Sequence, residues 1–422
     1  MADKLDTEPL KGVRDFYPDE MAERKALFGT IRRTLELRGY EEYDASPLER
    51  SELYESKGNE EIIRDQTYSF TDRGGRRITL RPEMTPSLAR MVAGKRRELT
   101  FPLRWFNIGN RFRYERPQRG RTREFYQTDV DLIGLPEGEA DVEIISIAHA
   151  LLIALGAKES DFTIRVNSRA LLRLAGAAAG LPEGETAKAY WQLLDRREKM
   201  SAEEFEKARA EFSADPLRII EAESDPAVKE EKAKVLRLIE ELAARGVGNA
   251  VFDTGIVRGF DYYTGTVFEV FDTDSANARS LFGGGRYDGL VSMFGGESVP
   301  GIGFAVGDIV IRDFLETHGL PLRGARSADV YIGTPSPGDA SKAQAFAGEL
   351  RDAGIRTFVN LTERALGDQV KEAVKRGIPY FIAFGAEEAK SSMVRLKDLA
   401  ASEEESIEEN QIVKHLKQVL KA

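Results

Sequence analysis

The sequence predicts an α+β protein of more than one domain, in which a part rich in β-hairpins precedes a helical segment and a small α/β domain. Three observations lead to this prediction. The chain has 422 residues, which is too long for one ordinary hydrophobic core. Residues 104–134 alternate between polar and apolar side chains on both sides of a turn-rich loop. From about residue 168 the pattern becomes helical, and after about residue 327 short apolar strands alternate with helices.

The first predicted elements are a helix, an edge strand and a hairpin. Residues 19–38 predict an amphipathic helix, and Gly39 follows as the residue that ends it. The apolar stripe of this helix consists of Phe28, Ile31 and Leu35. Next comes EEYDASPLERSELY at residues 41–54, which begins with an extended segment that ends near Pro47 and has the pattern of an edge strand. Residues 67–80 predict a hairpin that turns at two adjacent glycines.

The predicted hairpin over residues 104–134 is the most informative feature of the chain. The charged face of its incoming strand consists of Arg111, Arg113 and Glu115. The corresponding face of its outgoing strand consists of Phe125, Gln127, Asp129 and Asp131. The loop between them, ERPQRGRTR, carries four arginines and turns at Pro117 and Gly120. Such a surface can bind a molecule that is anionic at one end and cationic at the other, such as a nucleotide beside an amino acid.

The charges of this hairpin alone favour a simpler interpretation, a solvated and ion-paired surface hairpin. The chemistry of the loop and the rest of the chain favour ligand binding. Residues 95–123 hold ten basic side chains against two glutamates, in a chain whose net charge is −10. Nucleic-acid binders are usually basic, so any RNA contact must be local to such a segment. A basic surface helix and strand is the plainer alternative.

A core helix, a strand and a helical insertion are predicted next. Residues 144–157 are the longest apolar stretch, shorter than the roughly 20 residues that a membrane-spanning helix needs. Residues 162–166, FTIRV, predict a strand. From about Ser168 to Gly246 the chain is rich in Ala, Glu, Lys and Leu and shows no strand-like alternation. Strands return at 267–271 and 302–306.

A domain boundary is predicted near residues 320–328, followed by a small, mainly parallel α/β domain. Its predicted strands are residues 330–332, 357–359 and 380–384. Its predicted helices are residues 340–353 and 365–376, with a last helix after Asn410. The run SEEESIEEN at residues 402–410 is predicted to be acidic and exposed.

Residue types restrict the chemistry that the chain can perform. There is no cysteine, which excludes disulfides and thiolate metal sites. The three histidines lie outside the blocks discussed below, so neither a histidine-based triad nor a zinc-bound water is expected. Arginine, carboxylate, tyrosine and bound magnesium remain, which favours phosphate chemistry. The N-terminus is charged from its third residue and lacks the apolar core of a secretory signal, so we expect a cytoplasmic protein without membrane contact.

Four blocks resemble, in order, motifs of class II aminoacyl-tRNA synthetases in their histidyl-tRNA synthetase version. They are LRPEMTPSLAR at 80–90, FRYERPQRGRTREFYQTDVD at 112–131, VRGFDYYTGTVFEVF at 257–271 and GGGRYDGLVSMFGG at 283–296. The resemblance implies a class II antiparallel sheet with flanking helices. It places the catalytic core in residues 1–168 and 249–325, a helical insertion in 169–248 and an anticodon-binding α/β domain in 327–422. The segment after the first helix resembles motif 1, which implies a homodimer.

The same resemblance implies a ligase that activates L-histidine with ATP and Mg²⁺ and transfers it to tRNA(His), with no DNA partner. Catalytic contacts with the α-phosphate are implied for Arg113 and Arg258. Glu115 would hold adenine, and Arg121 the β- and γ-phosphates. Histidine-binding residues are implied to be Glu83, Thr85, Gln127, Asp131, Arg258, Tyr262 and Tyr263. Arg286 and Tyr287 are expected at the pocket edge, next to glycines that let the backbone approach the ligand.

Without the family, simpler roles are open for several of these residues. Arg258 would be a structural ion pair, the two adjacent tyrosines would be strand core, and Glu83 would begin a helix. The sequence also departs from the family pattern. Val310 stands where motif 3 usually has an adenine-stacking arginine, and Arg312 would point elsewhere on a helix. Asp131 is a longer carboxylate in some members, and Asp368 replaces a frequent lysine of the C-terminal domain.

Two other functions are compatible with parts of this pattern. A non-catalytic synthetase-like regulatory subunit of ATP phosphoribosyltransferase shares the core, but it usually lacks the C-terminal domain and relaxes the catalytic arginines. A synthetase for another amino acid is disfavoured by the block with two adjacent tyrosines. Exchange of pyrophosphate into ATP that depends on histidine would separate these alternatives.

Overall fold

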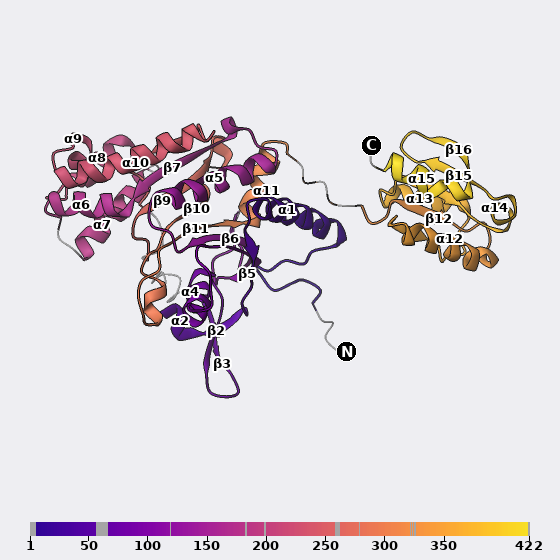
Figure 1. Ribbon diagram of the computed structural model, residues 1–422, viewed down its shortest axis with the longest axis horizontal. Helices are drawn as coiled ribbons and strands as arrows, with labels where there is room; N and C mark the ends of the chain where they lie inside the picture. Colours follow the sequence, from indigo (N-terminus) through magenta and orange to yellow (C-terminus); the bar gives the residue numbers. More distant parts are fainter. Residues whose placement is uncertain are drawn as a thin grey trace. The chain divides into compact units, whose positions relative to one another are not determined.

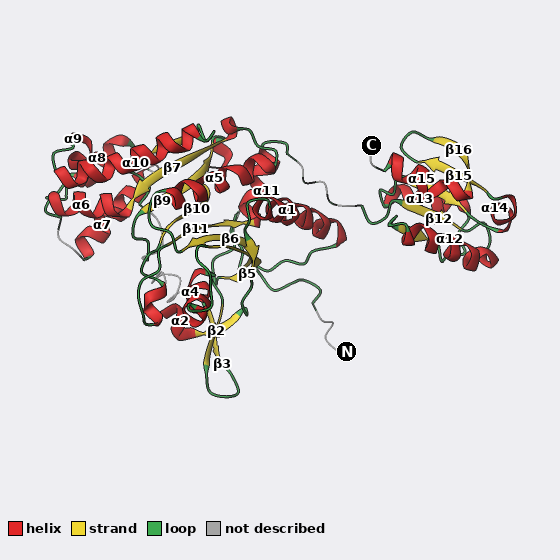
Figure 2. Cartoon of the chain, viewed as in Figure 1, coloured by secondary structure: helices red, strands yellow, loops and turns green. Residues whose placement is uncertain are grey.

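The structure is a computed structural model that divides the chain into two compact units, Met1–Leu322 and Arg323–Ala422. Each unit is described by itself (Figures 1 and 2). The described residues are 6–55, 66–118, 120–181, 184–197, 200–257, 262–277, 279–320, 322, 324 and 326–420. Among them, no helix combines the length and the apolar character needed to cross a membrane.

The first unit is built on an eight-stranded sheet with the order β1-β5-β6-β11-β10-β9-β7-β8. The six central strands are antiparallel, and each edge strand pairs in parallel with its neighbour. In this order the strands are β1 (Glu41–Glu42), β5 (Leu103–Phe112), β6 (Glu124–Ile133), β11 (Gly301–Gly307), β10 (Ser280–Arg286), β9 (Thr266–Asp272), β7 (Phe162–Ser168) and β8 (Ala250–Phe252). The predicted hairpin is therefore the pair β5 and β6, inside the sheet.

Helices cover one face of this sheet, because the alternating strands present their apolar residues there. The covering helices are α1 (Pro18–Glu36), α5 (Glu139–Ala154), α10 (Pro226–Ala244) and α11 (Asp308–Thr317). They form one core with the strand residues Val130, Leu132 and Phe304. Gly39 has a φ of +76°, a conformation that favours glycine and suits the end of α1. The opposite face carries polar side chains and an aromatic cluster that packs against α4 (Thr85–Lys95).

A three-stranded sheet precedes α4. It has the order β2 (Leu48–Arg50), β4 (Arg77–Leu80), β3 (Tyr68–Thr71), and the short helix α2 (Ser51–Glu55) follows β2. The predicted hairpin with its glycine turn is thus confirmed, and Gly75 adopts a φ of +77°. The described residues of this unit also form the short 3₁₀ helices η1 (Glu159–Asp161), η3 (Ser275–Asn277) and η4 (Val291–Phe294).

The described residues between β7 and β8 form only helices and their connections, as the sequence predicts. Before α10 these are α6 (Arg169–Ala178), α7 (Glu185–Asp195), α8 (Ala202–Arg209) and α9 (Pro216–Ala222). Figure 1 shows them gathered at one end of the sheet. They have a hydrophobic core of their own around Leu171, Tyr190 and Leu217, so this segment packs as a separate helical layer.

Strand β10 was not predicted, because its sequence, SLFGGGR, contains three glycines, which are unfavourable in strands. The tertiary structure explains them. A Cβ at Gly284 would collide with the carbonyl oxygen of Gly303 on β11, and one at Gly283 would press on the carbonyl oxygen of Phe268 on β9. The glycines therefore let three central strands pack closely.

The second unit has a five-stranded sheet with the order β13-β12-β14-β15-β16. Its strands are β12 (Val330–Gly333), β13 (Thr357–Val359), β14 (Tyr380–Ala383), β15 (Met393–Asp398) and β16 (Glu403–Glu408). Its helices are η5 (Pro337–Asp339), α12 (Ala340–Asp352), α13 (Leu366–Lys375), α14 (Ala386–Ser391) and α15 (Glu409–Val419). The predicted strands and helices are present, and the structure adds the helix α14 and the strands β15 and β16 between β14 and the last helix, α15.

The prediction of a mainly parallel sheet in this unit is wrong. Two strand pairs are parallel, and the two pairs that involve β15 are antiparallel. Strand β16 was not predicted from the sequence because this edge strand is exposed and carries glutamates at most positions. Charged side chains on an edge strand prevent pairing with other chains, and they also remove the apolar alternation that predicts a strand.

Candidate active site

A buried polar network lies in the centre of the hairpin. Asp129 accepts hydrogen bonds from the Arg111 Nη2 at 2.5 Å and from the Gln127 Nε2 at 2.8 Å. The same Arg111 nitrogen donates to Asn107 Oδ1 at 2.6 Å. These side chains share one face because Arg111 is opposite Phe125 and Asn107 is opposite Asp129 in the strand register. The network fixes the amide of Gln127, one of the predicted histidine-binding groups.

Several arginines of the basic segment at residues 95–123 are already paired inside the protein. Arg111 has an exposed fraction of 0% and is used inside the protein. Arg104 pairs with Glu143 at 2.7 Å, and Arg96 pairs with Glu297 at 3.2 Å. The basic residues 95–123 therefore do not form a continuous surface for a polyanion, although they form one basic segment in the sequence.

Asp131 lies two residues further along β6 and is buried. Its Oδ1 accepts a hydrogen bond from the hydroxyl of Tyr287. Its Oδ2 is buried and has no hydrogen-bond partner among the described residues. Burial raises the pKa of Asp131 to about 8 and the charge of Asp129 adds to this, although Tyr287 and Arg111 oppose it. An acid in this state can donate or accept a hydrogen bond near neutral pH.

Glu83 is a second buried carboxyl group, placed just before α4. The hydroxyl of Tyr262 donates to its Oε2 at 3.0 Å. Burial raises the pKa of Glu83 to about 7, while the positive charge of Arg113 lowers it. The pKa of Tyr262 is raised by burial and by Glu83, and a hydrogen bond with Thr85 opposes that shift. The predicted residues Glu83, Thr85 and Tyr262 are therefore together.

Arg113 follows the last residue of β5. Its Nε donates to the carbonyl oxygen of Pro82 at 3.0 Å, and its guanidinium carbon lies 5.3 Å from the centre of the Phe125 ring. Burial lowers the pKa of Arg113, and the negative charge of Glu83 opposes that shift. An arginine keeps its proton even so, because its ordinary pKa is far above neutral. The carbonyl and the ring hold this cation beside Glu83.

The loop ERPQRGRTR at residues 115–123, called the arginine loop below, contains an ion pair between two predicted nucleotide-binding residues. Arg121 Nη1 donates to Glu115 Oε2 at 3.0 Å. The N-terminal segment supports the base of the loop, because the carbonyl oxygen of Gly12 accepts hydrogen bonds from the backbone of Arg123 and Glu124. Arg123 in turn stacks on the Tyr114 ring, 4.0 Å from its centre.

Of the two predicted pocket-edge residues, the structure places only Tyr287 with the other site residues. Arg286 is buried and uses all five of its N–H groups. Nε and Nη2 bind Asp141, Nη1 binds Asp288, and the remaining two N–H groups bind the carbonyl oxygens of Leu135 and Pro136. Arg286 therefore ties the start of α5 to the sheet and has no N–H group left for a ligand.

The neighbouring glycines make room for side chains of the protein. A Cβ at Gly303 would collide with Asp131 Oδ1, one at Gly301 would lie 2.6 Å from the Tyr287 ring, and one at Gly285 would lie 3.1 Å from the Tyr263 ring. For the glycines of GGGRYDG, of which Gly285 is one, the sequence predicted that the backbone approaches a ligand. In the structure Gly285, Gly301 and Gly303 seat three residues of the predicted pocket wall.

Val310 and Arg312 behave as the sequence indicates. Val310 packs against the core on α11, and a Cβ at Gly120 of the arginine loop would lie 3.9 Å from its Cγ2. Arg312 binds Glu23 on α1 at 3.0 Å. Arg312 therefore does not take the position of the missing arginine.

Arg258 lies outside the described residues, which stop at Val257 and resume at Tyr262. The flanks of this gap are fixed. Arg169 Nη1 donates to the carbonyl oxygen of Val257 at 2.9 Å, and Tyr262 binds Glu83. The role of Arg258 stays a prediction.

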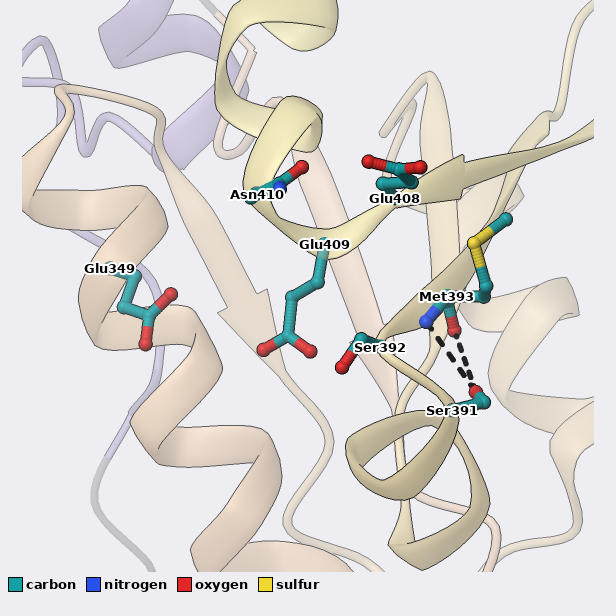
Figure 3. Close-up of a pocket in the computed structure, with 7 residues that line it drawn as sticks. All are labelled: Glu349, Ser391, Ser392, Met393, Glu408, Glu409 and Asn410. Atoms are coloured by element: carbon teal, nitrogen blue, oxygen red, sulfur yellow. Dashed lines mark hydrogen bonds between the residues drawn. The ribbon is translucent and has the colours of Figure 1, made fainter.

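The described residues form two cavities, and the first is lined in part by Tyr263, one of the predicted histidine-binding residues. One, of about 260 Å³, lies between α6, α7 and residues Tyr263 and Thr264. The other, of about 450 Å³, lies in the second unit and is shown in Figure 3. Its lining includes Glu349, Glu408 and Glu409, whose carboxylates repel phosphate groups. Among the described residues, no group of three or more His, Cys, Asp or Glu could hold a metal ion.

The two raised carboxyl pKa values predict a stability that depends on pH. The ordinary pKa of a carboxyl group is about 4, whereas the pKa in the folded protein is about 7 for Glu83 and about 8 for Asp131. At pH values between these limits the folded protein binds more protons than the unfolded chain. The free energy of unfolding should therefore fall as pH rises through this window, and each of the two groups adds to the slope.

Urea unfolding at pH 5, 6, 7 and 8 measures this slope. The double variant Glu83→Gln, Asp131→Asn should show a flatter profile than the unchanged protein, because the amides do not titrate. Equal slopes for the two proteins would contradict the assignment of raised pKa values to these carboxyls.

The architecture defines the class of protein. An antiparallel sheet core with flanking helices, which includes the arginine-bearing hairpin of β5 and β6, and a separate α/β unit are the features that the sequence predicted for a class II aminoacyl-tRNA synthetase.

Comparisons with known proteins give the family. Residues 12–308 match the family model described as histidyl-tRNA synthetase, and residues 329–419 match the one described as anticodon binding domain. A histidine–tRNA ligase of Leptospira biflexa is 37% identical over 99% of both chains, and one of Thermococcus kodakarensis is 36% identical over 98% of this chain and 99% of that protein. The crystal structure of histidyl-tRNA synthetase from Nostoc sp. PCC 7120 superimposes with a TM-score of 0.80 and 25% identity, over 98% of this chain and 100% of that one. The chain belongs to the histidyl-tRNA synthetase family.

Proposed function

We propose that the protein is a histidine–tRNA ligase, which forms histidyl-adenylate from L-histidine and ATP and then transfers histidine to the 3′ end of tRNA(His). The observation that carries the proposal is the arrangement of charge along one face of β5 and β6. Cationic Arg113 and the arginine loop lie at one end, and Gln127 and the buried Asp131 lie at the other. This order suits a nucleotide and an amino acid side by side.

In the first reaction a carboxylate oxygen of histidine bonds to the α-phosphorus of ATP, and the bond from that phosphorus to the bridging oxygen breaks to release pyrophosphate. Negative charge grows on the phosphoryl oxygens. We assign Arg113 and Arg258 to those oxygens. Arg113 is suited to this role because Pro82 and Phe125 already hold it in position, so little reorganisation is needed when charge develops.

We assign Glu115 to adenine and Arg121 to the β- and γ-phosphates. In the structure these two side chains bind each other, so the ion pair has to exchange for contacts with the nucleotide. Arg121 is about half exposed, which makes the exchange inexpensive because exposed pairs contribute little to stability. Mg²⁺ is expected to arrive with ATP and to bind chiefly through its phosphates, as is usual for nucleotide sites.

Histidine recognition is assigned to the two buried carboxyls and their neighbours. Glu83, Thr85 and Gln127 would bind the α-ammonium group, Asp131 and Tyr263 would face the imidazole nitrogens, and Tyr262 would orient Glu83. The ammonium charge would favour ionised Glu83. A site built from buried polar groups rejects analogues that leave those groups unpaired.

The second unit is assigned to the anticodon of tRNA, because its residues match an anticodon-binding domain. A homodimer that acts in the cytoplasm completes the proposal. A regulatory subunit is the competing function; a structure described as an ATP phosphoribosyltransferase regulatory subunit or histidyl-tRNA synthetase from Bacillus halodurans shares the fold with a TM-score of 0.71 at 23% identity. That likeness concerns the fold alone.

Pyrophosphate exchange tests the proposal. Purified protein should transfer label from pyrophosphate into ATP when L-histidine is present, and should give only background with each other amino acid. Transfer of histidine to tRNA(His) should require ATP. No exchange with histidine by a folded preparation would favour the regulatory subunit, and exchange with a different amino acid would favour a synthetase for that amino acid.

A further inference from the structure

The segment before α1 and the start of α11 meet at one buried carboxyl group, that of Asp308. Asp308 is the first residue of α11. Its Oδ2 accepts a hydrogen bond from the Arg14 Nη2 at 2.8 Å, and its Oδ1 accepts one from the backbone N–H of Tyr126 at 3.0 Å. One side chain therefore joins the N-terminal segment, the beginning of β6 and the helix α11.

The contact with Tyr126 adds one hydrogen bond beyond the end of a central strand. Strand β11 ends at Gly307, which is opposite Gln127 on β6. Tyr126 is the next residue of β6 toward the arginine loop, where β11 no longer provides a backbone acceptor. Backbone N–H groups away from water need an acceptor, and the carboxyl group of Asp308 supplies it. Asp308 therefore fixes β6 close to the point where the arginine loop joins it.

Arg14 belongs to a segment that lies directly against the arginine loop. Two residues before it, the carbonyl oxygen of Gly12 accepts hydrogen bonds from the N–H of Arg123 at 2.7 Å and from that of Glu124 at 3.2 Å. Gly12 has a φ of +88°, and a Cβ there would lie 2.8 Å from Arg123 Cγ and 3.0 Å from Pro117 Cγ. The contact therefore leaves no room for a side chain at this position.

An aromatic cluster fixes the other end of this segment. The ring of Phe16 packs edge-on against the ring of Tyr126, with 6.0 Å between their centres. The guanidinium carbon of Arg24 on α1 lies 4.2 Å from the centre of the Phe16 ring and 4.1 Å from that of Tyr126. The segment from Gly12 to Phe16 is thus fixed at both ends, with the ion pair of Arg14 between them.

The tip of the arginine loop lies near α11 as well. A Cβ at Gly120 would lie 3.9 Å from Val310 Cγ2 and 4.0 Å from Asp313 Oδ2. Val310 stands where the sequence pattern usually has an arginine, so α11 supplies no cation at this position. The loop is therefore placed between the N-terminal segment and α11, and Asp308 ties these two elements together.

We propose that Asp308 and Arg14 are positioning residues for the nucleotide part of the site, which keep the arginine loop in place through the N-terminal segment. They act through the residues that the loop offers to ATP, Glu115 and Arg121, and they bind neither ATP nor histidine themselves. The inference rests on the proposed function and deepens it. Arg14 and Asp308 are 294 residues apart in the chain, so no local pattern indicates the pair.

Two variants interrupt this connection at different points. Gly12→Ala adds a methyl group that collides with Arg123, in a backbone conformation that disfavours alanine, and it leaves every buried charge in place. Asp308→Asn keeps an acceptor for Tyr126 and turns an NH₂ group toward Arg14. In each variant the KM for ATP in pyrophosphate exchange should rise by about five- to tenfold, while the KM for histidine should change by less than about twofold.

The double variant Gly12→Ala, Asp308→Asn should raise the KM for ATP no further than the larger single effect, because both substitutions break the same connection. Gly12→Ala keeps the test decisive even where Asp308→Asn folds poorly, since residue 12 lies outside the core.

Trypsin cleavage after Arg121 measures the position of the arginine loop without any substrate. Cleavage of a loop that opens transiently follows the population of its open form. The rate should therefore be higher in Gly12→Ala and in Asp308→Asn than in the unchanged protein, by about the same factor as the KM for ATP.

Arg312→Met is the matched control. Arg312 lies four residues after Asp308 on α11, and its Nη2 donates to Glu23 Oε2 at 3.0 Å. This pair also ties α11 to the N-terminal part of the chain, but its partner belongs to α1 and not to the segment before it. The KM for ATP and the rate of cleavage after Arg121 should both stay unchanged in this variant.

Any of three results would overturn the inference: an unchanged KM for ATP in folded Gly12→Ala, an equal rise of the KM for both substrates, or an equal effect of Arg312→Met. Absence of histidine-dependent exchange in the unchanged protein would overturn the proposed function and this inference with it. Exchange in that protein, together with unaltered cleavage after Arg121 in Gly12→Ala and Asp308→Asn, would overturn the inference alone.

Discussion

Replacing Arg113 with methionine should lower histidine-dependent pyrophosphate exchange by about 100- to 1,000-fold, the usual effect of removing one preorganised donor to a developing anion. Methionine keeps much of the apolar stem that packs near Phe125, so the change is mainly one of charge and hydrogen bonding. The loss should appear in kcat as well as in kcat/KM, because the contact strengthens as the α-phosphate gains charge.

Arg116→Met is the matched control for this variant. Arg116 lies three residues further on, in the adjoining loop ERPQRGRTR, and it is exposed. Its replacement removes the same charge from a nearby position, so an effect of general electrostatics would appear in both variants. Retention of more than about a tenth of the exchange by a folded Arg113→Met protein would contradict the role of this arginine.

Replacing Arg111 with methionine should reduce the free energy of unfolding by about 3–5 kcal/mol, because it leaves Asp129 charged, buried and without its main partner. Urea unfolding measures this change in the transition of the first unit. Both side chains are almost completely buried, with exposed fractions of 0% for Arg111 and 3% for Asp129. The amide of Gln127, which Asp129 orients, should also lose its position, so the KM for histidine should rise in the same variant.

An exposed ion pair provides the comparison. Arg32 and Glu42 also form a close pair, 2.7 Å apart, but each side chain is 38% exposed. Arg32→Met should cost less than about 1 kcal/mol. The double variant Arg111→Met, Asp129→Leu should recover much of the stability lost in the single variant, since the uncompensated buried charge is gone. Equal costs for Arg111→Met and Arg32→Met would show that burial does not decide the strength of these pairs.

Strongly periodic elements were predictable from the sequence. The helix α1, the hairpin of β5 and β6, the glycine turn after β3 and the first three strands of the second unit all have local patterns with one clear meaning. The candidate site was predictable where a motif names its residues. Glu83, Thr85, Arg113 and Tyr262 are together in the structure, as are Gln127 with Asp129 and Asp131 with Tyr287.

Elements whose residues are explained only by distant neighbours were not predictable. The glycines of β10 indicate a loop in the sequence, and only the close packing of β9 and β11 against them explains why they lie in a strand. The acidic strand β16 has no apolar alternation because it is an edge. Arg286 looked like a ligand-binding arginine, but only the position of α5 shows that Asp141 and two carbonyl oxygens occupy its guanidinium group.

The sequence by itself determined the residue types and their order along the strands, and hence which side chains share a face of the hairpin. Side-chain direction alternates within a strand, so this property is local. Only the tertiary structure decided which charges are buried, which are already paired and which remain for a ligand. Arg111 and Arg113 are two residues apart in one strand pattern, yet one is part of the core network and the other lies beside Glu83. Burial and partner choice depend on strands and helices far away in the chain, and no local pattern contains them.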